Sequence, residues 1–137
     1  MMQSSDKVYW HNYINFYEGF FAGKSFSNIV EIGVLNGNSM RWLLERFPEA
    51  RIYGADIVPL QENWPRDPRI CYVQMDQGDA AQVRKLFSLA AFDLIIEDGS
   101  HRPDHQITAL VEGIRSLNNG GIYILEDIHT SHPRHKE

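Results

Sequence analysis

Acidic side chains close each of five strand-like runs in this sequence. Glu31 lies near the end of the first run, and the later runs end in Asp56, Asp76, Asp98 and the pair Glu126 and Asp127. Acids are common at such places, because they cap helices and begin turns. A cluster of carboxylates, however, is repulsive unless cations or hydrogen-bond donors offset it. The series therefore predicts a shared polar site, and unconnected caps and turn residues are the alternative.

The later acids have the chemistry of a divalent metal site. Asp98 and the pair Glu126 and Asp127 follow strands that could be neighbours, and oxygen ligands without a thiolate suit Mg²⁺ ahead of Ca²⁺ or Mn²⁺. His101 could act beside this metal as a general base, because the pKa of histidine lies near working pH. His105 falls inside the next helix, so we expect a structural or supporting role for it.

A glycine-containing turn follows the first run. The stretch N-I-V-E-I-G-V-L-N-G-N-S from Asn28 to Ser39 predicts a strand, a tight turn and a helix start that Asn38 or Ser39 can cap. The N–H groups of that helix start attract polar ligand atoms. The spacing G-x-x-x-G departs from the G-x-G-x-x-G of dinucleotide sites. Glu31 would repel a phosphate and attract a cationic amino group, as in an amino-acid moiety. A simple packing turn is the alternative.

The second and third runs end in residues that suit a nucleoside. Asp56 is placed to accept hydrogen bonds from ribose hydroxyls, which leaves no room for a 2′-phosphate. Asp76 and Gln77 can present a carboxylate and an amide to an adenine edge. For this second pair, a turn followed by a capped helix is an equally good interpretation.

Strands and helices alternate along the chain. We expect strands at 28–32, 52–56, 69–75, 92–97 and 122–125, and helices after residue 38, at 79–89 with Asp79 as N-cap, and from Pro103 to about Leu117. Asn118-Asn-Gly-Gly121 is expected to stop the last helix. This order implies right-handed crossovers and an α/β fold with a mainly parallel sheet covered on both faces. Such sheets bind ligands at the carboxyl ends of their strands, where the acids lie.

Length and composition fit one domain of 137 residues, with 43% hydrophobic and 23% charged residues. We divide it into an N-terminal helical segment (1–27) with an aromatic-faced helix from Tyr9 to Phe21, a core (28–127) and a polar tail (128–137). A net charge of −5 disfavours nucleic acid and anionic membranes as partners. No signal peptide or membrane span is recognisable, so a cytoplasmic location is expected. The single Cys71 is expected to be a buried, inert thiol.

Several motifs, in order, resemble the macrocin and mycinamicin type sugar O-methyltransferases, a branch of the class I enzymes that depend on S-adenosylmethionine (SAM). They are Ser5-Asp-Lys7 with the aromatic residues after it, Glu31-Ile-Gly33 to Ser39, Ile52-Tyr-Gly-Ala-Asp-Ile57, Asp76-Gln77, Glu97-Asp-Gly-Ser-His101 and Glu126-Asp-Ile-His-Thr-Ser131. The last two are specific, because their pairing is not a general methyltransferase feature.

This resemblance implies a Rossmann-like, doubly wound sheet of order 3-2-1-4-5. It implies a SAM site formed by Glu31, Gly33, Gly37, Ser39, Asp56, Ile57, Asp76, Gln77 and Asp98. It also implies Mg²⁺ held by Asp98, Glu126 and Asp127, with His101 as base. The expected reaction is an in-line displacement that moves the methyl group of SAM to a hydroxyl of a sugar-containing small molecule or glycan.

Family members continue past the Thr-Ser pair with further strands, which this sequence lacks. We therefore expect the fifth strand to be a sheet edge covered by a second protomer of a homo-oligomer or by the N-terminal segment. Two other functions stay open. One is a truncated, non-catalytic SAM-binding module that needs a partner chain for its acceptor site. The other is a nicotinamide-dependent oxidoreductase, which the glycine spacing disfavours.

Overall fold

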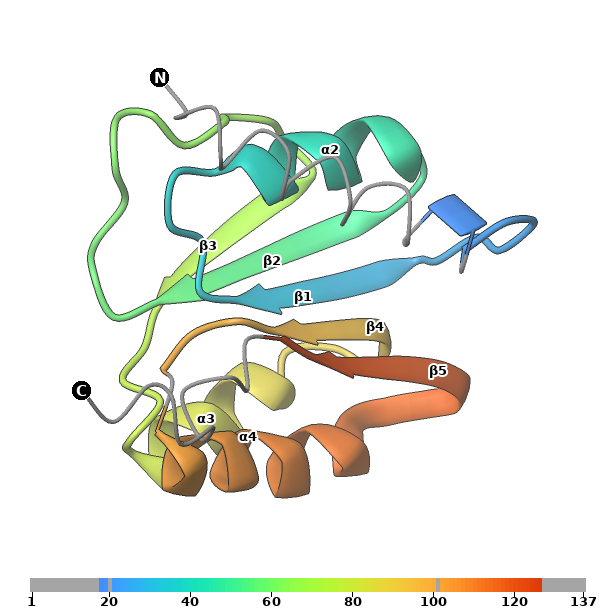
Figure 1. Cartoon of the computed structure of the whole chain (residues 1–137). Helices are drawn as coiled ribbons and strands as arrows, with labels where there is room; N and C mark the ends of the chain where they lie inside the picture. The colour runs from blue at the N-terminus through green and yellow to red at the C-terminus, as the bar shows by residue number, and fades with distance from the viewer. Residues whose placement is uncertain (1–17, 20, 101, 127–137) are drawn as a thin grey trace, which may run out of the picture.

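One parallel sheet forms the centre of the molecule (Figure 1). The computed structural model describes residues 18–19, 21–100 and 102–126. The strands are β1 (Asn28–Ile32), β2 (Arg51–Asp56), β3 (Ile70–Gln74), β4 (Phe92–Glu97) and β5 (Leu117–Leu125). They lie side by side in the order β3-β2-β1-β4-β5, and all four strand pairs are parallel. The α/β class and the order 3-2-1-4-5 predicted from the sequence are confirmed, and the order of the strands reverses between β1 and β4.

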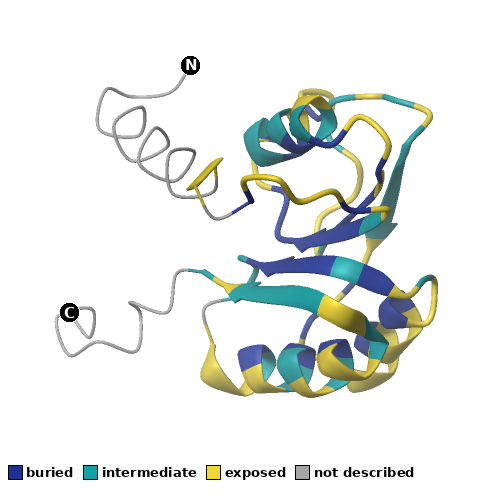
Figure 2. Cartoon of the chain, turned by 90° about the vertical axis from the view of Figure 1, so that its right-hand side faces the viewer, coloured by how far each residue is buried: buried dark blue, intermediate teal, exposed yellow. Residues whose placement is uncertain are grey.

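Helices cover both faces of this sheet. Figure 1 shows α2 (Asn38–Arg46) on one side and α3 (Ala80–Phe87) with α4 (Pro103–Ser116) on the other. Neighbouring residues of β1 point to opposite faces, as the strand period of two requires. Ile29 packs in the cluster that contains Met40 of α2, whereas Val30 packs in the cluster that contains Val83 of α3. The central strands are therefore buried on both sides, which Figure 2 shows in dark blue.

The two predicted helix caps have different outcomes. Asp79 is the N-cap of α3, where its carboxylate accepts hydrogen bonds from the N–H groups of Ala81 (3.0 Å) and Gln82 (3.4 Å). The prediction for α2 is wrong, because its N-cap is Gly37 and no side chain caps it. The hydroxyl of Ser39 bonds to the first strand instead, so a long-range partner outcompetes the local one.

The start of β5 is also a correction. Asn118 to Gly121 were expected to stop the last helix, ahead of a strand at 122–125. The helix does end before them, at Ser116, but β5 begins at Leu117 and includes them. Leu117 pairs with Phe92 and Ile122 with Leu94, so the register of β5 shifts against β4. Gly120 has φ +78°, a conformation that glycine adopts without strain. The segment therefore continues the strand as an irregularity rather than ending the helix in a separate loop.

The predictions for the N-terminal helix, the C-terminal tail and Cys71 have different outcomes. The predicted helix from Tyr9 lies mostly outside the described residues, but its last aromatic, Phe21, is fully buried, with its ring centroid 5.5 Å from that of Phe26. The tail 128–137 lies outside them as well. Cys71 is half-buried on β3 rather than fully buried. Within the described ranges, no helix has the length and apolarity needed to cross a membrane.

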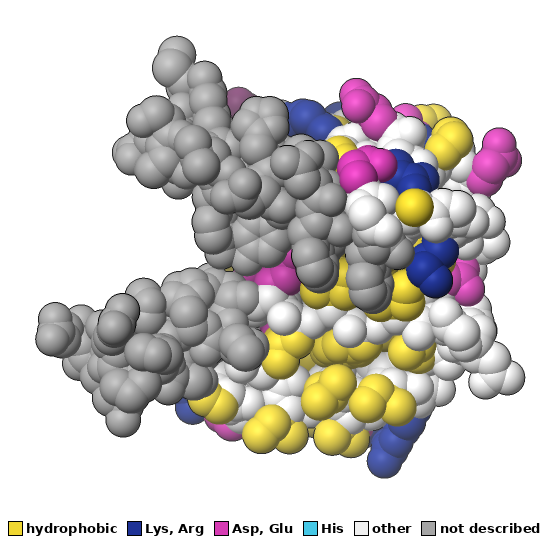
Figure 3. Space-filling view, turned by 45° about the vertical axis from the view of Figure 1, so that its right-hand side comes forward, with side chains coloured by type: hydrophobic (Ala, Val, Ile, Leu, Met, Phe, Trp, Pro, Cys, Tyr) yellow, Lys and Arg dark blue, Asp and Glu magenta, His cyan; other side chains and the backbone are white. Residues whose placement is uncertain are grey.

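Apolar side chains are exposed on the outer face of α4. Ile107, Val111 and Ile114 lie one or two turns apart and are 61%, 46% and 57% exposed. Leu125, at the end of β5, is 37% exposed. Figure 3 shows hydrophobic side chains gathered on the lower half of one face of the molecule.

Candidate cofactor and metal site

A cavity of about 260 Å³ lies at the carboxyl ends of the strands. Its walls come from β1 and the segments that follow β1, β2, β3 and β4, which is the expected ligand position in an open α/β sheet. Six residues predicted for the cofactor line it: Gly33, Asp56, Ile57, Asp76, Gln77 and Asp98. Five further lining residues were not predicted to bind the cofactor: Ile32, Leu35, Gly99, Ser100 and His105.

A larger hollow of about 400 Å³ lies between the ends of α3 and α4. None of the predicted site residues lines it. Its two arginines, Arg84 and Arg115, both pair with Glu112, at 3.5 Å and 3.8 Å. Both arginines thus already have an acidic partner within the chain, although this leaves one net positive charge. The smaller cavity, which the predicted residues do line, is the candidate site.

Gly33 brings three strand ends together beneath the candidate cavity. It has φ +91°, and a Cβ atom at this position would lie 2.2 Å from the main-chain oxygen of Asp98. Its N–H donates to the carbonyl of Ala55 over 2.7 Å. A side chain would therefore push β4 away from β1. The glycine predicted from its spacing is required here by both close approach and backbone conformation.

Asp56 organises the turn that follows β1. One carboxylate oxygen accepts hydrogen bonds from the N–H groups of Val34 (2.9 Å) and Leu35 (3.4 Å), and the other from Val58 (3.2 Å). Leu35 has φ +56°, a left-handed conformation that is rare for residues other than glycine. Its carbonyl accepts the indole N–H of Trp64 at 2.7 Å. Strained residues held in this way cluster at ligand sites.

Glu31 is buried and is not among the residues that line the cavity. The residue is 2% exposed, and its carboxyl group accepts a 2.5 Å hydrogen bond from Ser39 Oγ. Burial raises the pKa of Glu31 to about 8, and the nearby acids Asp98 and Asp56 add to the effect. Gly37 and Ser39 likewise do not line the cavity. Contacts of these three residues with a cofactor stay predictions.

Gln77 and Glu97 form a buried pair at the floor of the site. The amide of Gln77 donates to Glu97 Oε1 (2.8 Å) and to the carbonyl of His105 (3.2 Å). Its oxygen accepts the N–H of Ser100 at 2.9 Å. Gln77 is 6% exposed and Glu97 is fully buried. The amide predicted to face adenine thus already has partners within the chain, and the adenine contact stays a prediction.

The metal part of the prediction lies partly outside the described residues. His101 and Asp127 are not described. Asp98 follows β4 and Glu126 follows β5, and the N–H of Glu126 donates to the carbonyl of Glu97 at 2.9 Å. Burial raises the pKa of Glu126 to about 7. Within the described ranges, no three His, Cys, Asp or Glu side chains are grouped to hold a metal ion. The carboxylates of Asp98 and Glu126 fit Mg²⁺ in their chemistry, because both are hard oxygen donors at neighbouring strand ends.

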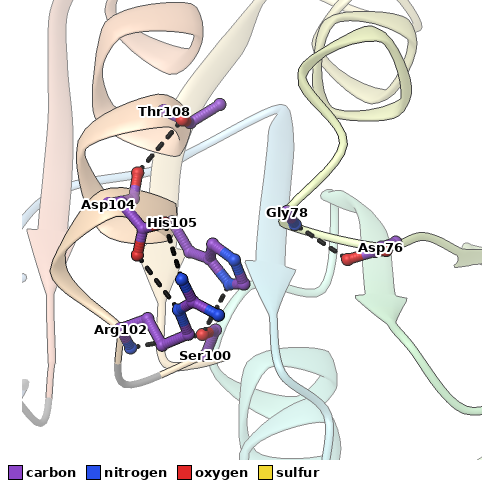
Figure 4. Close-up of polar contacts among 7 residues, drawn as sticks. All are labelled: Asp76, Gly78, Ser100, Arg102, Asp104, His105 and Thr108. Carbon is purple, nitrogen blue, oxygen red and sulfur yellow. Dashed lines mark hydrogen bonds and ion pairs between the residues drawn. The ribbon is translucent and has the colours of Figure 1, made fainter.

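His105 and Ser100 are functional candidates that the sequence did not single out as ligand contacts. His105 Nδ1 lies 2.8 Å from Ser100 Oγ, and both residues line the cavity (Figure 4). A Cβ atom at Gly78 would lie 2.8 Å from His105 Nε2, so the imidazole packs against the turn after β3. The sequence signal that could have identified His105 was its position, because the first turn of a helix that follows a strand lies at the carboxyl edge of the sheet.

An exposed ion pair lies at the beginning of α4, near this imidazole. The guanidinium of Arg102 donates to both carboxylate oxygens of Asp104, at 3.2 Å and 3.1 Å (Figure 4). Hydrogen bonds from this arginine lower the pKa of Asp104 below its ordinary value. Both side chains are exposed, so their contribution to stability is small.

A doubly wound sheet with a cavity at the switch between β1 and β4 defines a Rossmann-like class of domain. Residues 30–128 match a family of methyltransferase domains, and the chain belongs to that family. The match covers the strand ends that form the cavity.

The individual relatives point to one branch of these enzymes. The chain is 35% identical, over 96% of its length, to the 8-demethyl-8-alpha-L-rhamnosyl tetracenomycin-C 2′-O-methyltransferase of Streptomyces olivaceus. It is 32% identical, over 76% of its length, to the mycinamicin VI 2″-O-methyltransferase of Micromonospora griseorubida. The predicted resemblance to sugar O-methyltransferases is confirmed.

A solved structure supports the same relation. MycE, a methyltransferase of the mycinamycin biosynthetic pathway solved with Mg and S-adenosylhomocysteine (SAH), superposes with a TM-score of 0.75 and 27% identity. The alignment covers 88% of this chain and 33% of MycE. The chain also spans 37% and 28% of the two relatives above. It therefore corresponds to about a third of each of these proteins.

Proposed function

We propose that this chain binds SAM in the cavity at the switch point and transfers its methyl group to a hydroxyl of a sugar-containing small molecule. One observation carries the proposal. In a chain of the methyltransferase family, the segments containing Gly33, Asp56, Asp76 and Asp98 converge on a single cavity. The relatives are named for transfer to sugar hydroxyls of glycosides, which supports a glycoside as the acceptor.

The described residues suit the nucleoside end of SAM. Asp56 lies at the cavity with its carboxylate fixed by three backbone N–H groups, and we assign it to the ribose hydroxyls. Leu35 and Ile57 are 71% and 62% exposed at the cavity wall, and apolar side chains there suit the faces of a purine. Asp76 offers a carboxylate to the adenine amino group. Glu31 is assigned to the amino-acid end, whose ammonium would favour its charged form.

The residues after β4 and β5 are assigned to the reaction itself. Asp98, Glu126 and Asp127 would hold Mg²⁺, and His101 would accept the proton of the acceptor hydroxyl. When bound, the metal lowers the pKa of that hydroxyl. This assignment is supported by the Mg in the MycE structure and by the matching motifs of this chain.

A non-catalytic SAM-binding module is the second candidate. The cavity that this candidate needs is formed by the described residues of this chain alone. In that case the cavity would bind SAM and another chain would supply the acceptor site.

We also propose that a second protomer covers the edge of β5, whose described partner in the sheet is β4. We propose a cytoplasmic location for the protein as well.

Calorimetry and a turnover assay separate these functions. We expect the chain to bind SAM and SAH but not NAD, whereas binding of NAD alone would overturn the proposal. With Mg²⁺ and a rhamnosyl glycoside, the enzyme should form SAH and a methyl ether. His101→Ala should abolish SAH formation and leave SAM affinity unchanged. Binding of SAM without turnover on any glycoside would support the module instead.

A further inference from the structure

We infer that Gln77 is the positioning residue of this site, and that its amide holds the loop after β4 in the shape that the reaction needs. The inference deepens the proposed function, on which it rests, because that loop carries Asp98 and His101. A role in positioning differs from the adenine contact expected of Gln77 from the sequence. It follows from what the amide touches.

The backbone hydrogen bonds between β4 and β1 end at Asp98. The N–H of Asp98 still donates to the carbonyl of Ile32 in β1, over 2.8 Å. The next two N–H groups bond to side chains instead: Gly99 N–H donates to Glu97 Oε1 (3.2 Å) and Ser100 N–H to Gln77 Oε1 (2.9 Å). Gln77 and Glu97 thus replace the missing strand for this loop. Buried backbone groups need such partners.

The side-chain amide of Gln77 has one favourable orientation. Both of its N–H groups have acceptors, Glu97 Oε1 and the carbonyl of His105, and its oxygen faces a donor, Ser100 N–H. The reversed amide would place oxygen against two acceptors. A single side chain therefore links the turn after β3, the end of β4, the loop and the first turn of α4.

The loop after β4 packs closely against the amide of Gln77. A Cβ atom at Gly99 would lie 2.5 Å from Gln77 Oε1 and 3.0 Å from a methyl carbon of Ile32. The loop backbone is thus pressed directly onto the amide. Small displacements of reacting groups are costly in catalysis, so a loop held this closely has a defined place for Asp98.

The test uses Gln77→Met, which keeps the length of the side chain and removes its hydrogen bonds. The affinity for Mn²⁺, used as a spectroscopic probe in place of Mg²⁺, is expected to fall about tenfold or more, and kcat by a similar factor. The KM and Kd for SAM are expected to change less than about threefold, because Asp56 and the β1 turn are untouched. A purely structural role would weaken SAM and Mn²⁺ binding together.

Gln61→Met is the matched control. Gln61 donates one exposed hydrogen bond, to the carbonyl of Pro59 in the loop after β2. It should leave both affinities and kcat as in the unmodified chain. An equal loss of Mn²⁺ affinity in the two variants, or none in Gln77→Met, would overturn the inference.

Amide hydrogen exchange tests the inference without depending on a variant that folds or on turnover. In the unmodified chain, the N–H groups of Gly99 and Ser100 should exchange at least about a hundredfold more slowly than an open loop. Free exchange at both positions would overturn the role of Gln77. If these amides are protected but neither SAM nor Mn²⁺ binds, the proposed function fails and the structural link through Gln77 stands.

Discussion

Ser39 Oγ donates a 2.5 Å hydrogen bond to the carboxyl group of Glu31, which is 2% exposed in the middle strand of the sheet. Burial raises the pKa of this group from 4.5 to about 8. The folded chain therefore keeps a proton on Glu31 at neutral pH, whereas the unfolded chain loses it at ordinary acidic pH. A buried neutral acid beside a cofactor pocket makes both stability and binding depend on pH.

The first prediction concerns stability between pH 4.5 and about 8, the two pKa values of Glu31. In this window the folded chain binds more protons than the unfolded chain, so the contribution of Glu31 is lost as pH rises, by up to about 1.4 kcal/mol per pH unit. Glu31→Gln removes this slope and is expected to be the more stable chain near pH 8. Urea unfolding of both chains at pH 5, 6, 7 and 8, chosen to span roughly the window, measures the difference. Parallel curves would contradict the prediction.

Gly33→Ala tests the close approach of β1 and β4. The new Cβ would lie 2.2 Å from the main-chain oxygen of Asp98, at φ +91°. We expect a loss of about 3 kcal/mol or more, or no folded chain. Gly120→Ala is the control, because φ is +78° there but no atom lies within 4 Å; it should cost only about 1 kcal/mol. Thermal unfolding compares the two, and equal losses would show that conformation alone requires Gly33.

The sequence predicted the sheet well where local and long-range preferences agree. β1 and β4 have the predicted bounds, because short runs of apolar and β-branched residues are flanked by turn residues. The start of β5 was missed, since Asn118 to Gly121 favour turns by themselves. They belong to β5 because the residues on either side of them, Leu117 and Ile122, pair with β4 and because Asn118 donates to Asp93. Residue propensity cannot contain that information.

The residues of the candidate site were likewise predicted from the sequence only in part. Gly33, Asp56 and Asp98 were predicted from spacing and strand position, and they line the cavity. The Gln77–Glu97 pair and the contact of His105 with Ser100 join residues far apart in the sequence or on different elements. Such pairings depend on the packing of α4 against the turn after β3. The roles of His101 and Asp127 stay predictions.

Asp79→Ala tests the cap of α3. The carboxylate of Asp79 accepts hydrogen bonds from two backbone N–H groups and from the side chain of Gln82, at 3.0, 3.4 and 3.1 Å. Its loss is expected to cost about 1 kcal/mol and roughly 4 °C in Tm, because those donors lose their acceptor. Asp79→Ser keeps a capping oxygen and should retain most of the stability. A Ser variant as unstable as the Ala variant would argue against capping.

Leu35→Asn should change stability and binding in opposite directions. Leu35 is held at φ +56° with 71% of its surface exposed. Asn tolerates this conformation, so we expect a gain of about 0.5–1 kcal/mol in the free energy of unfolding. The apolar wall of the cavity is lost at the same time, and SAM affinity should fall several-fold. Thermal unfolding and calorimetry measure the two effects, and unchanged SAM affinity would place Leu35 outside the binding surface.

Asp56→Asn tests the assignment of the ribose site. Both carboxylate oxygens of Asp56 accept backbone hydrogen bonds, from Val34 and Leu35 on one side and from Val58 on the other. An amide must turn its NH₂ group toward one of these donors, so the turn loosens and an acceptor for the ribose hydroxyls is lost. We expect the Kd for SAM to rise at least about tenfold, or about 1.4 kcal/mol.

Asp67→Asn is the control for this change. Asp67 accepts the N–H of Arg69 at 2.9 Å, in the loop before β3, and does not line the cavity. The Asp67→Asn variant, like Asp56→Asn, removes one negative charge, so any general electrostatic effect on the cationic ligand appears in both variants. Calorimetry with SAM should show its affinity within about twofold of the unmodified chain, because the charge of Asp67 lies outside the site and is already paired with Arg69 at 3.6 Å. If both variants lose affinity equally, net charge rather than ribose recognition determines binding, and the nucleoside pocket must be sought elsewhere along the strand ends.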